Sequence, residues 1–310
     1  MPAEPRQMVP EPAAGGGDAG APVDVSVILV SYNTRELTKQ CLASLREKTR
    51  GVSCEVWVVD NASRDGSAAM IRECFPDVKL IENGENLGFG RANNRALLRA
   101  RGTYCFLLNT DTLLRNNAVR IFFEYMESHP GIGACGGNLV DANGAPVASF
   151  GYRPTPETML LRKTPWKLLR PRRNRAVKRY EQDIDRTVCQ PVGFIVGADL
   201  FLRRRALDAA GLFDERFFLY YEETELQHRI AQAGWGIQFV PEAEIVHLVG
   251  KSTPSEQKAR MMYRSRILYF RLCFGPLSGW LARTLYFKKY VSELRKLRKE
   301  ARAAGGAGPG

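Results

Sequence analysis

The sequence predicts an α/β protein built on a doubly wound, mostly parallel sheet. Over residues 24–128, short apolar runs alternate with segments that have the spacing of amphipathic helices, which is typical of strands joined by helical crossovers. The apolar runs are largely hydrophobic throughout, as expected for strands that helices cover on both faces. The connections between these strands are therefore expected to be right-handed.

The elements of this first part follow one another in a regular order. A strand at 25–30 precedes apolar residues at helical spacing, so a helix is expected to begin near Arg35, where Asn33 or Thr34 can cap it. Further strands are expected at 55–59, 78–82 and 104–108, with helices at 67–74, 90–101 and 116–128.

The second part of the chain is expected to be less regular. Residues 140–190 are rich in arginine and show no clear periodicity. From Ser255 onwards the chain is expected to be helical, with a break at Gly275-Pro276. Between these segments, strand signals occur at 193–197, 200–203, 237–240 and 243–247, and helix signals at 205–210 and before Gly234.

Composition limits the class of protein. The 310 residues are 45% hydrophobic, which is enough for one large domain or two small ones. The seven cysteines include no Cys-x-x-Cys pair, so they indicate a reducing compartment and not a disulfide framework or zinc site. Residues 1–22 lack the apolar segment of a signal peptide, and no apolar run approaches the roughly 18–20 residues of a spanning helix. We therefore expect a cytoplasmic protein, free or peripheral on the cytoplasmic face of the inner membrane.

The net charge of +12 is unevenly distributed. Residues 151–180 carry a net charge of +9 and residues 251–310 a net charge of +11, whereas the remainder of the chain carries −8. The α/β part is therefore acidic, and two segments hold the positive charge. This asymmetry predicts an anionic partner surface, either anionic lipid or nucleic acid.

Two of the predicted strands end in acidic side chains. The run 56–59 leads into Asp60-Asn61, and the run 104–108 leads into Asn109-Thr110-Asp111. The carboxyl ends of parallel strands share one edge of a sheet, so these acids are expected to line a single crevice. Because carboxylates suit a hard divalent cation, we infer that the crevice holds a nucleotide diphosphate-sugar through such a cation.

Six motifs follow one another along the chain. They are Ser31-Tyr32-Asn33, the loop 60–67 from Asp60 to Ser67, Glu85-Asn86-Leu87-Gly88-Phe89, Asn109-Thr110-Asp111, Glu222-Glu223-Thr224-Glu225-Leu226 and the segment 247–252 from His247 to Ser252. In this order they resemble the family 2 glycosyltransferases of the GT-A fold, particularly the bacterial rhamnosyltransferase-like members. The resemblance covers about residues 24–290. It implies a Rossmann-like nucleotide-binding half with a mostly parallel sheet, followed by C-terminal amphipathic helices.

The resemblance implies a role for each nucleotide-binding residue. The Asp60 carboxylate accepts the N3–H of a uracil or thymine ring, next to Ser31 and Asn33 on the neighbouring strand end. An alternative for Asp60 alone is an ordinary turn acid. The loop that shapes the nucleotide pocket contributes further residues at the start of a helix, whose N-terminus suits an anion. These residues are Asn86, Gly88 and Arg91.

The segment Asn109-Thr110-Asp111 resembles the Asp-x-Asp motif of the family. Asp111 matches the last acid and is expected to hold Mg²⁺ or Mn²⁺. Asn109 replaces the usual first Asp, so it can bond ribose or sugar hydroxyls but adds no charge. His247 matches a family histidine that contacts the metal or diphosphate, and Lys251 and Ser252 follow it where phosphate oxygens would be reachable.

The acidic pair Glu222 and Glu223 follows the aromatic residues of 217–221. A carboxyl group in such surroundings can have its pKa raised towards a value useful for a general base, although acids are also favoured at a solvated helix start. The resemblance implies that Glu223 takes the proton of the acceptor hydroxyl, with Glu222 as the alternative. Glu225 is spaced to pair with Arg229.

The C-terminal region 256–299 mixes aromatic and aliphatic residues with Lys and Arg. Two arrangements fit this composition: an interfacial helix on anionic lipid, or a helix packed on the domain with its basic face in solvent. The arginine cluster 170–179 can likewise lie in solvent or meet a lipid-linked diphosphate acceptor. The apolar stripe of the helix, near Trp280, consists of Leu277, Leu281, Leu285, Val291 and Leu294.

The resemblance therefore implies an inverting, metal-dependent glycosyltransferase. The expected donor is thymidine diphosphate-rhamnose (dTDP-rhamnose), with a uridine diphosphate (UDP)-sugar as the alternative. The expected acceptor is a cell-surface polysaccharide or a lipid-linked saccharide. Two other classes remain open. A basic nucleic-acid-binding protein is disfavoured because the charge lies outside the α/β part and no RNA-binding signature occurs. A nucleotidyltransferase would release pyrophosphate.

The expected organisation follows from these assignments. A single catalytic domain is flanked by tails and by a basic helical region. The predicted segments are a disordered tail 1–22, a GT-A catalytic domain 23–250 (a nucleotide-sugar-binding half 23–128 and an acceptor-binding half 129–250), a basic amphipathic helical region 251–300 and a disordered tail 301–310.

Overall fold

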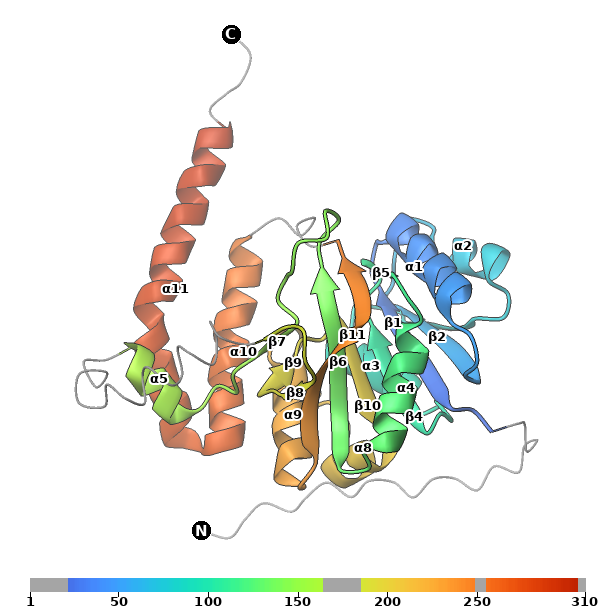
Figure 1. The fold of residues 1–310 in the computed structure, drawn as a ribbon. Helices are drawn as coiled ribbons and strands as arrows, with labels where there is room; N and C mark the ends of the chain where they lie inside the picture. Colours follow the sequence, from blue (N-terminus) through green and yellow to red (C-terminus); the bar gives the residue numbers. More distant parts are fainter. Residues whose placement is uncertain (1–21, 164–184, 249–254, 306–310) are drawn as a thin grey trace.

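The computed structural model describes residues 22–163, 185–248 and 255–305, and within them nine strands form one sheet with helices on both faces (Figure 1). The predicted α/β fold is confirmed. The first four strands pair with one another in parallel: β1 (Val25–Ser31), β2 (Cys54–Asp60), β3 (Lys79–Glu82) and β4 (Tyr104–Leu108). They are connected by the helices α1 (Arg35–Lys48), α2 (Ser67–Cys74) and α3 (Phe89–Leu97).

The second half of the chain extends the same sheet. It contributes β5 (Thr112–Leu114), β6 (Ile132–Val140), β8 (Gln190–Pro191), β10 (Asp199–Arg203) and β11 (Gly236–His247). The strand order is β3-β2-β1-β4-β10-β6-β11-β5, and β8 pairs with β11. Strand β10 runs antiparallel to both of its neighbours, and β5 runs antiparallel to β11. The two predicted halves, 23–128 and 129–250, therefore share one sheet.

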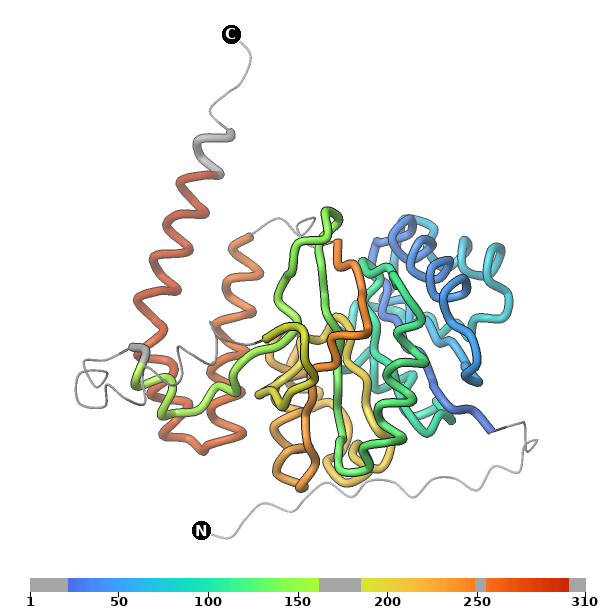
Figure 2. Tube along the Cα trace, in the orientation of Figure 1, coloured from blue at the N-terminus to red at the C-terminus, as the bar shows by residue number. Residues whose placement is uncertain are grey.

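The remaining helices lie on the sheet or beside it (Figures 1 and 2). The sheet is covered in part by α4 (Ala118–Ser128), α8 (Arg204–Ala210) and α9 (Glu222–Gln232). Beside it, α10 (Glu256–Phe274) and α11 (Pro276–Gly305) form an antiparallel pair. The two helices are joined at the predicted break, Gly275-Pro276. A small second sheet pairs β7 (Phe150–Gly151) with β9 (Phe194–Ile195), and α5 (Pro156–Lys163) lies against α11.

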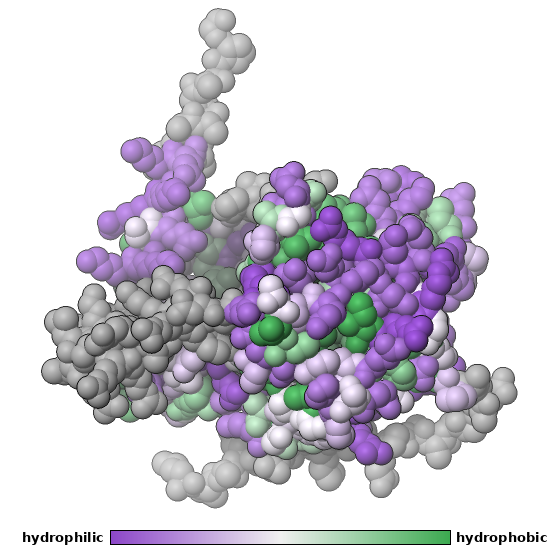
Figure 3. All heavy atoms as spheres, in the orientation of Figure 1, coloured by the Kyte–Doolittle hydropathy of each residue, from purple (hydrophilic) through white to green (hydrophobic). Residues whose placement is uncertain are grey.

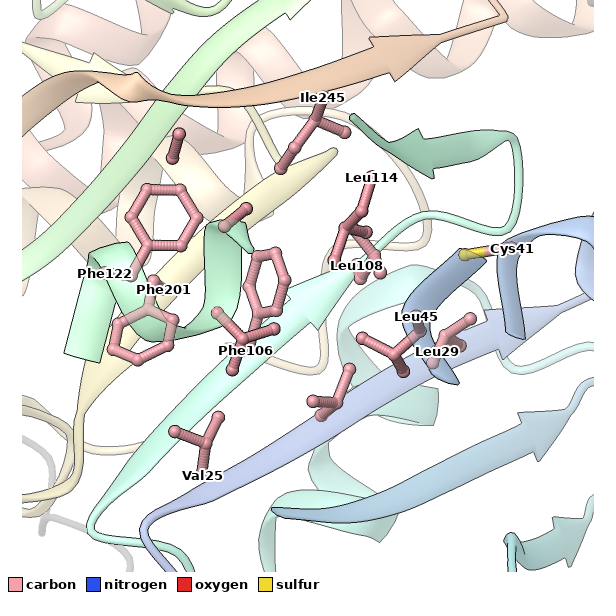
Figure 4. Packing of buried hydrophobic residues seen from close by; sticks show 14 of the residues in the cluster. Val25, Leu29, Cys41, Leu45, Phe106, Leu108, Leu114, Phe122, Phe201 and Ile245 are labelled. Carbon is pink, nitrogen blue, oxygen red and sulfur yellow. The ribbon is translucent and has the colours of Figure 1, made fainter. Parts of the chain in front are cut away.

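The hydrophobic core lies on both faces of the sheet because the side chains of each strand alternate between the faces. On one face, Phe106 and Phe201 pack against Phe122 of α4, with ring centroids 5.5 and 5.3 Å from it (Figure 4). On the other face, Leu107 packs with residues of α3, α8 and α9. Strands β1 and β4 are covered on both sides, which explains why they are hydrophobic along their length.

Strand β6 is not recognisable from the sequence because it contains several glycines. A Cβ at Gly137 would lie 2.3 Å from the backbone oxygen of Ala243, and a Cβ at Gly136 would lie 2.2 Å from the Ile195 side chain. Glycine thus lets neighbouring segments of the same polypeptide approach the strand closely, although it weakens the strand signal in the sequence. The sequence predicts two strands at 237–240 and 243–247, but β11 is one strand with an irregular register between Val240 and Glu244.

The helical pair α10–α11 packs on the domain through a third hydrophobic cluster. Phe217, Tyr269, Phe270 and Ala282 are buried in this cluster, and Leu281 and Leu285 of the predicted stripe pack against it.

Among the described residues, no helix is both long and apolar enough to cross a membrane. Of the predicted tails 1–22 and 301–310, residues 1–21 and 306–310 lie outside the described residues, as do the cluster 170–179 and residues Lys251 and Ser252. Residues 301–305 belong to α11.

Candidate functional site

The strand register brings the predicted nucleotide-binding residues to one edge of the sheet. Ser31 of β1 lies opposite Asp60 of β2. Beyond β4, the backbone N–H of Asn109 donates to the carbonyl oxygen of Ala198 at 2.9 Å. The segment Asn109-Thr110-Asp111 therefore leaves the sheet at the same edge, as expected for a crevice at the carboxyl ends of parallel strands.

Asp60 has one engaged and one unpaired carboxylate oxygen. The side chain is buried, with 3% of its surface exposed. Its Oδ2 accepts the backbone N–H of Ser63 at 2.9 Å, whereas Oδ1 is buried without a hydrogen-bond partner among the described residues. Because a buried acceptor without a partner costs free energy, Oδ1 is suited to a donor on a ligand.

Ser31 and Asn33 make contacts within the protein. The buried Ser31 hydroxyl lies 3.2 Å from the Thr34 hydroxyl. Asn33 has a left-handed φ of 53°, its Oδ1 accepts the N–H of Arg64 at 2.8 Å, and its N–H donates to Ser63 Oγ at 2.9 Å. Asn33 thus ties the end of β1 to the loop after β2.

The predicted side-chain cap of α1 is wrong. Thr34 is the N-cap residue, but its side chain makes no capping hydrogen bond. Instead, the backbone N–H of Arg35 donates to Oδ2 of Asp65 at 2.8 Å. Oδ1 of Asp65 accepts the N–H of Ser67 at the start of α2, so one acid of the loop 60–67 serves two helix starts. A cap supplied by a residue distant in sequence is not visible in the local pattern.

Asn61 organises the loop between β3 and α3, a role that the sequence alone did not reveal. Its side chain is buried, with 2% exposed. Its Nδ2 donates to Asn86 Oδ1 and to the Gly88 carbonyl, both at 3.1 Å, and its Oδ1 accepts from Asn83 Nδ2 at 2.8 Å. Asn86 Oδ1 also accepts the Gly88 N–H at 2.9 Å. The sequence signal for this role was the position of Asn61, an asparagine directly after the acid that ends the strand.

Gly88 joins this loop to the segment that leads to the acidic pair. The N–H of Phe89 donates to the Phe218 carbonyl at 3.0 Å. Gly88 has φ of 80°, and a Cβ there would lie 2.1 Å from that same carbonyl oxygen. Arg91, one turn into α3, forms an exposed ion pair with Glu215 at 3.5 Å. Such a pair contributes little to stability.

Gly88→Ala is expected to destabilise the protein by about 1–3 kcal/mol and to weaken nucleotide binding. The added Cβ would displace the Phe218 carbonyl and break its hydrogen bond to Phe89. Gly84→Ala, in the same loop, is the matched control because a Cβ there meets nothing within 4 Å. Thermal unfolding and calorimetric titration with uridine diphosphate measure both effects, and equal behaviour of the two variants would contradict this role of Gly88.

Asp111 and His247 lie together although they are distant in the sequence. Strand β5 begins directly after Asp111 and pairs with the end of β11, so that Thr112 lies opposite His247. Nε2 of His247 is 3.4 Å from Oδ1 of Asp111, and their side chains are 18% and 34% exposed. The backbone N–H of Leu248 donates to the Asp111 carbonyl at 2.8 Å. The two side chains that the resemblance assigns to the metal therefore lie next to each other.

The acidic pair begins α9 after two residues with unusual backbone conformations. Tyr220 and Tyr221 have φ of 72° and 69°, which is uncommon for residues other than glycine. Glu222 is buried, with 3% exposed, and its Oε2 has no partner among the described residues. Burial, and then the charge of Glu223, raises the pKa of Glu222 to about 8. Burial also raises the pKa of the half-buried Glu223.

Glu223 lies near the strand end that carries Asn109. A Cβ added at Gly197 would be 3.7 Å from the Glu223 Cβ and 3.4 Å from the ring of Phe89. The next residue, Ala198, is the one whose carbonyl accepts the Asn109 N–H. Glu223, Phe89 and Asn109 therefore all lie next to the short segment Gly197-Ala198.

The predicted pairing of Glu225 with Arg229 is confirmed. Arg229 Nε and Nη2 bond the two carboxylate oxygens of Glu225 at 2.7 and 2.8 Å. Arg229 also donates to the carbonyls of Ala210 and Leu212. This network fixes α9 against the turn after α8 and so holds the helix that presents the acidic pair.

Comparison with known proteins identifies the family. The sequence model described as "Glycosyl transferase family 2" matches residues 26–211. The chain is 30% identical over 268 residues to the N-acetylglucosaminyl-diphospho-decaprenol L-rhamnosyltransferase of Mycobacterium tuberculosis, covering 82% of this chain and 85% of that protein. It is 23% identical to the low-salt glycan biosynthesis hexosyltransferase Agl10 of Haloferax volcanii, covering 86% of each.

Solved structures show the same fold. The mannosyltransferase PcManGT from Pyrobaculum calidifontis, in complex with GDP-Man and Mn²⁺, superposes with a TM-score of 0.57 at 20% identity, over 98% of this chain and 79% of that one. S. aureus TarS 1-349 in complex with UDP-GlcNAc superposes with a TM-score of 0.54 at 15% identity, over 80% and 67%. These likenesses show a GT-A fold, and with the sequence matches they establish that the chain belongs to glycosyl transferase family 2.

Proposed function

We propose that this glycosyltransferase moves a sugar, rhamnose in the first instance, from a pyrimidine nucleoside diphosphate to a hydroxyl of a lipid-linked or polysaccharide acceptor, with inversion. The observation that carries the proposal is the buried Oδ1 of Asp60 at the end of β2, which has no hydrogen-bond partner among the described residues. It suits the N3–H of uracil or thymine, for which a charge-assisted hydrogen bond is favourable. The rhamnosyltransferase relative supports the choice of sugar.

In the proposed reaction Glu223 acts as the general base. It accepts the proton of the acceptor hydroxyl, whose oxygen bonds to the anomeric carbon as the bond from that carbon to the diphosphate breaks. Attack opposite the leaving group inverts the anomeric configuration. Burial and the charge of Glu223 raise the pKa of Glu222 to about 8, so Glu222 mainly keeps its proton at neutral pH, and we assign the proton transfer to Glu223.

The residues around Asp111 fit a divalent cation. Oδ1 of Asp111 and Nε2 of His247 are 3.4 Å apart and partly exposed, so both can face one ion. Within the residues that the structure describes, no group of three or more His, Cys, Asp or Glu side chains gathers at a possible metal site. Two protein ligands are sufficient because Mg²⁺ and Mn²⁺ at diphosphates complete their shell with phosphate oxygens and water. When bound, the cation offsets the charge of the departing diphosphate.

Calorimetric titration with nucleoside diphosphates in the presence of Mn²⁺ tests the donor proposal. Thymidine and uridine diphosphates are expected to bind, and Asp60→Asn is expected to weaken them by about 10–100-fold, because a hydrogen bond to a charged group is worth roughly 1.5–3 kcal/mol. Asp77→Asn, a substitution of an exposed acid away from the site, is the control. Absence of binding by both nucleotides would refute the proposal, and release of pyrophosphate from a donor would indicate a nucleotidyltransferase instead.

We further propose that α11 lies on an anionic membrane surface. The side chains of Leu277, Trp280 and Phe287 are 69%, 60% and 54% exposed, and their spacing places them on one face of the helix. Arg283 and Lys288 are exposed on either side of that face, and hydrophilic side chains cover the distal part of α11 in Figure 3. An apolar stripe flanked by cations is the arrangement that binds anionic lipid interfaces.

Vesicle sedimentation tests this surface. The protein is expected to bind vesicles that contain phosphatidylglycerol and to bind pure phosphatidylcholine weakly. Replacing Trp280 and Phe287 together by alanine is expected to reduce binding at least about tenfold, since burying each large side chain contributes roughly 1.5–3 kcal/mol. Leu98→Ala removes an equally exposed apolar side chain from α3's C-terminal end and should have no effect. Undiminished binding by the double variant would refute the proposal.

A further inference from the structure

A cavity of about 220 Å³ lies among α5, α10 and α11, next to the start of α9. Its described lining includes the aromatic residues Tyr152, Tyr221 and Tyr286, the hydroxyl residue Thr158 and the cations Arg266 and Lys289. None of the described residues that line it is an acid. The cavity is smaller than the roughly 300–1,000 Å³ that is usual for whole ligands, so it suits one charged group of a larger molecule.

Arg266 is held in a fixed orientation at this cavity. Its Nε donates to the Tyr221 hydroxyl at 2.7 Å, and its guanidinium carbon lies 4.3 Å from the ring centroid of Tyr286 and 5.6 Å from that of Tyr221. The side chain is half-buried, and the structure gives its Nη1 and Nη2 groups no acceptor among the described residues. A planar guanidinium with a free edge matches the oxygens of a phosphate group.

Lys289 supplies a second positive charge on the opposing helix. Its side chain is exposed and, among the described residues, no carboxylate forms an ion pair with Lys289 or with Arg266. By contrast, the nearby Arg298 and Arg260 both pair with Glu256. Two cations that converge on one cavity without acids repel each other, and an anionic ligand would relieve that repulsion.

The cavity is joined directly to the segment that presents the acidic pair. Tyr221, whose hydroxyl orients Arg266, is the N-cap of α9 and precedes Glu222. The neighbouring Ser265 hydroxyl donates to the Leu219 carbonyl at 2.7 Å. Through Tyr221, the cavity therefore adjoins the backbone segment that leads into the acidic pair.

We propose that this cavity is an acceptor subsite that binds the diphosphate group of a lipid-linked acceptor. Arg266 and Lys289 donate hydrogen bonds to the phosphate oxygens, and the sugar attached to the diphosphate then extends towards Glu223. The inference rests on the proposed transferase function, and it adds the chemical class of the acceptor and the residues that select it. A neutral polysaccharide acceptor would leave both cations unused.

Direct binding tests the subsite without requiring catalysis. The full-length protein is titrated with farnesyl diphosphate and, separately, with inorganic pyrophosphate, in the absence of donor and metal. Farnesyl diphosphate is expected to bind, and Arg266→Gln and Lys289→Gln are each expected to weaken it about tenfold. Lys296→Gln makes the same charge change at an exposed position further along α11, outside the described lining, and should have no effect, and Arg266→Lys should recover part of the affinity.

The outcomes separate the subsite from the transferase proposal. The subsite would be overturned if farnesyl diphosphate did not bind, if Lys296→Gln weakened binding equally, or if neither Lys289→Gln nor Arg266→Gln weakened it. Binding of pyrophosphate alone would assign the cavity to a free anion and overturn its role for the acceptor. In transfer assays the two variants should raise the KM for a diphosphate-linked acceptor and leave the KM for the donor unchanged. The variants could change farnesyl diphosphate binding as expected while no pyrimidine donor supports transfer. That result would support the anion site and refute the transferase proposal.

Discussion

Glu223→Gln is expected to lower kcat for sugar transfer about 10²–10⁴-fold, the usual contribution of a general base. Glu222→Gln is expected to keep most of the activity at pH 7. Glu222 is the more buried of the two, and burial together with the charge of Glu223 raises its pKa to about 8. It is therefore mainly protonated at neutral pH, and glutamine resembles that neutral form.

The pH dependence distinguishes the two carboxyl groups. Activity is expected to rise with the ionisation of Glu223, whose pKa is raised by burial above its usual 4.5, and to change again near pH 8 when Glu222 loses its proton. Glu222→Gln should abolish the second change only. Initial rates between pH 5 and 9 measure both, and a Glu222→Gln variant as inactive as Glu223→Gln would reverse the assignment of the base.

Thermal unfolding provides an independent check on the same pair. Folded Glu222 retains a proton that the unfolded chain releases above pH 4.5, so its contribution to stability falls as the pH rises from 4.5 to about 8. Glutamine has no such dependence. The Tm of Glu222→Gln should therefore rise relative to the Tm of the unchanged protein as the pH increases over this range. A Tm difference that stays constant with pH would contradict the raised pKa of Glu222.

Asp111→Asn is expected to lower kcat/KM at least about 10²-fold and to remove most of the dependence on Mn²⁺, because metal stabilisation of the diphosphate is worth several kcal/mol. Asp111 supplies a carboxylate beside His247 in the predicted metal-binding pair. The measurement is the transfer rate as a function of Mn²⁺ concentration, together with uridine diphosphate titration. Retention of a Mn²⁺-stimulated rate near that of the unchanged protein would refute the role of Asp111.

Asn109→Asp is the informative partner of this variant. It adds a second carboxylate to the segment that ends in Asp111, which should lower the Mn²⁺ concentration needed for half-maximal activity. His247→Ala should raise it. Asp77→Asn removes an acid that pairs with Arg46 at the surface and should leave the metal dependence unchanged, so that loss of net charge alone is excluded as the cause.

Much of the nucleotide-binding half was predictable from local sequence. Strands β1, β2 and β4 are covered on both faces, so their residues are almost all apolar and the strand ends are marked by the sudden polarity at Ser31, Asp60 and Asn109. The pairing of Glu225 with Arg229 was predictable because residues four apart share a helix face. Strand β6 was not, because Gly136 and Gly137 serve a close approach of neighbouring chain that only the folded structure contains.

The C-terminal stripe illustrates the same limit. The spacing grouped Leu277 with Leu281 and Leu285, but Leu281 and Leu285 pack on the third cluster whereas Leu277 is exposed. Helical spacing identifies the apolar face of a helix. Which residues of that face are covered by the rest of the protein depends on the angle at which α11 crosses α10. The exposed stripe therefore includes Phe287, which the sequence pattern had not selected.

Hydrophobic periodicity and the polar residues at strand ends were sufficient to predict the fold class, the order of the main strands and helices in the first half, and the residue types at the crevice edge. Which of those residues meet depends on tertiary contacts. The antiparallel pairing of β5 with β11 placed His247 beside Asp111, and the packing of α10 placed Arg266 against Tyr221. Such contacts join residues far apart in the chain, and no local pattern encodes them.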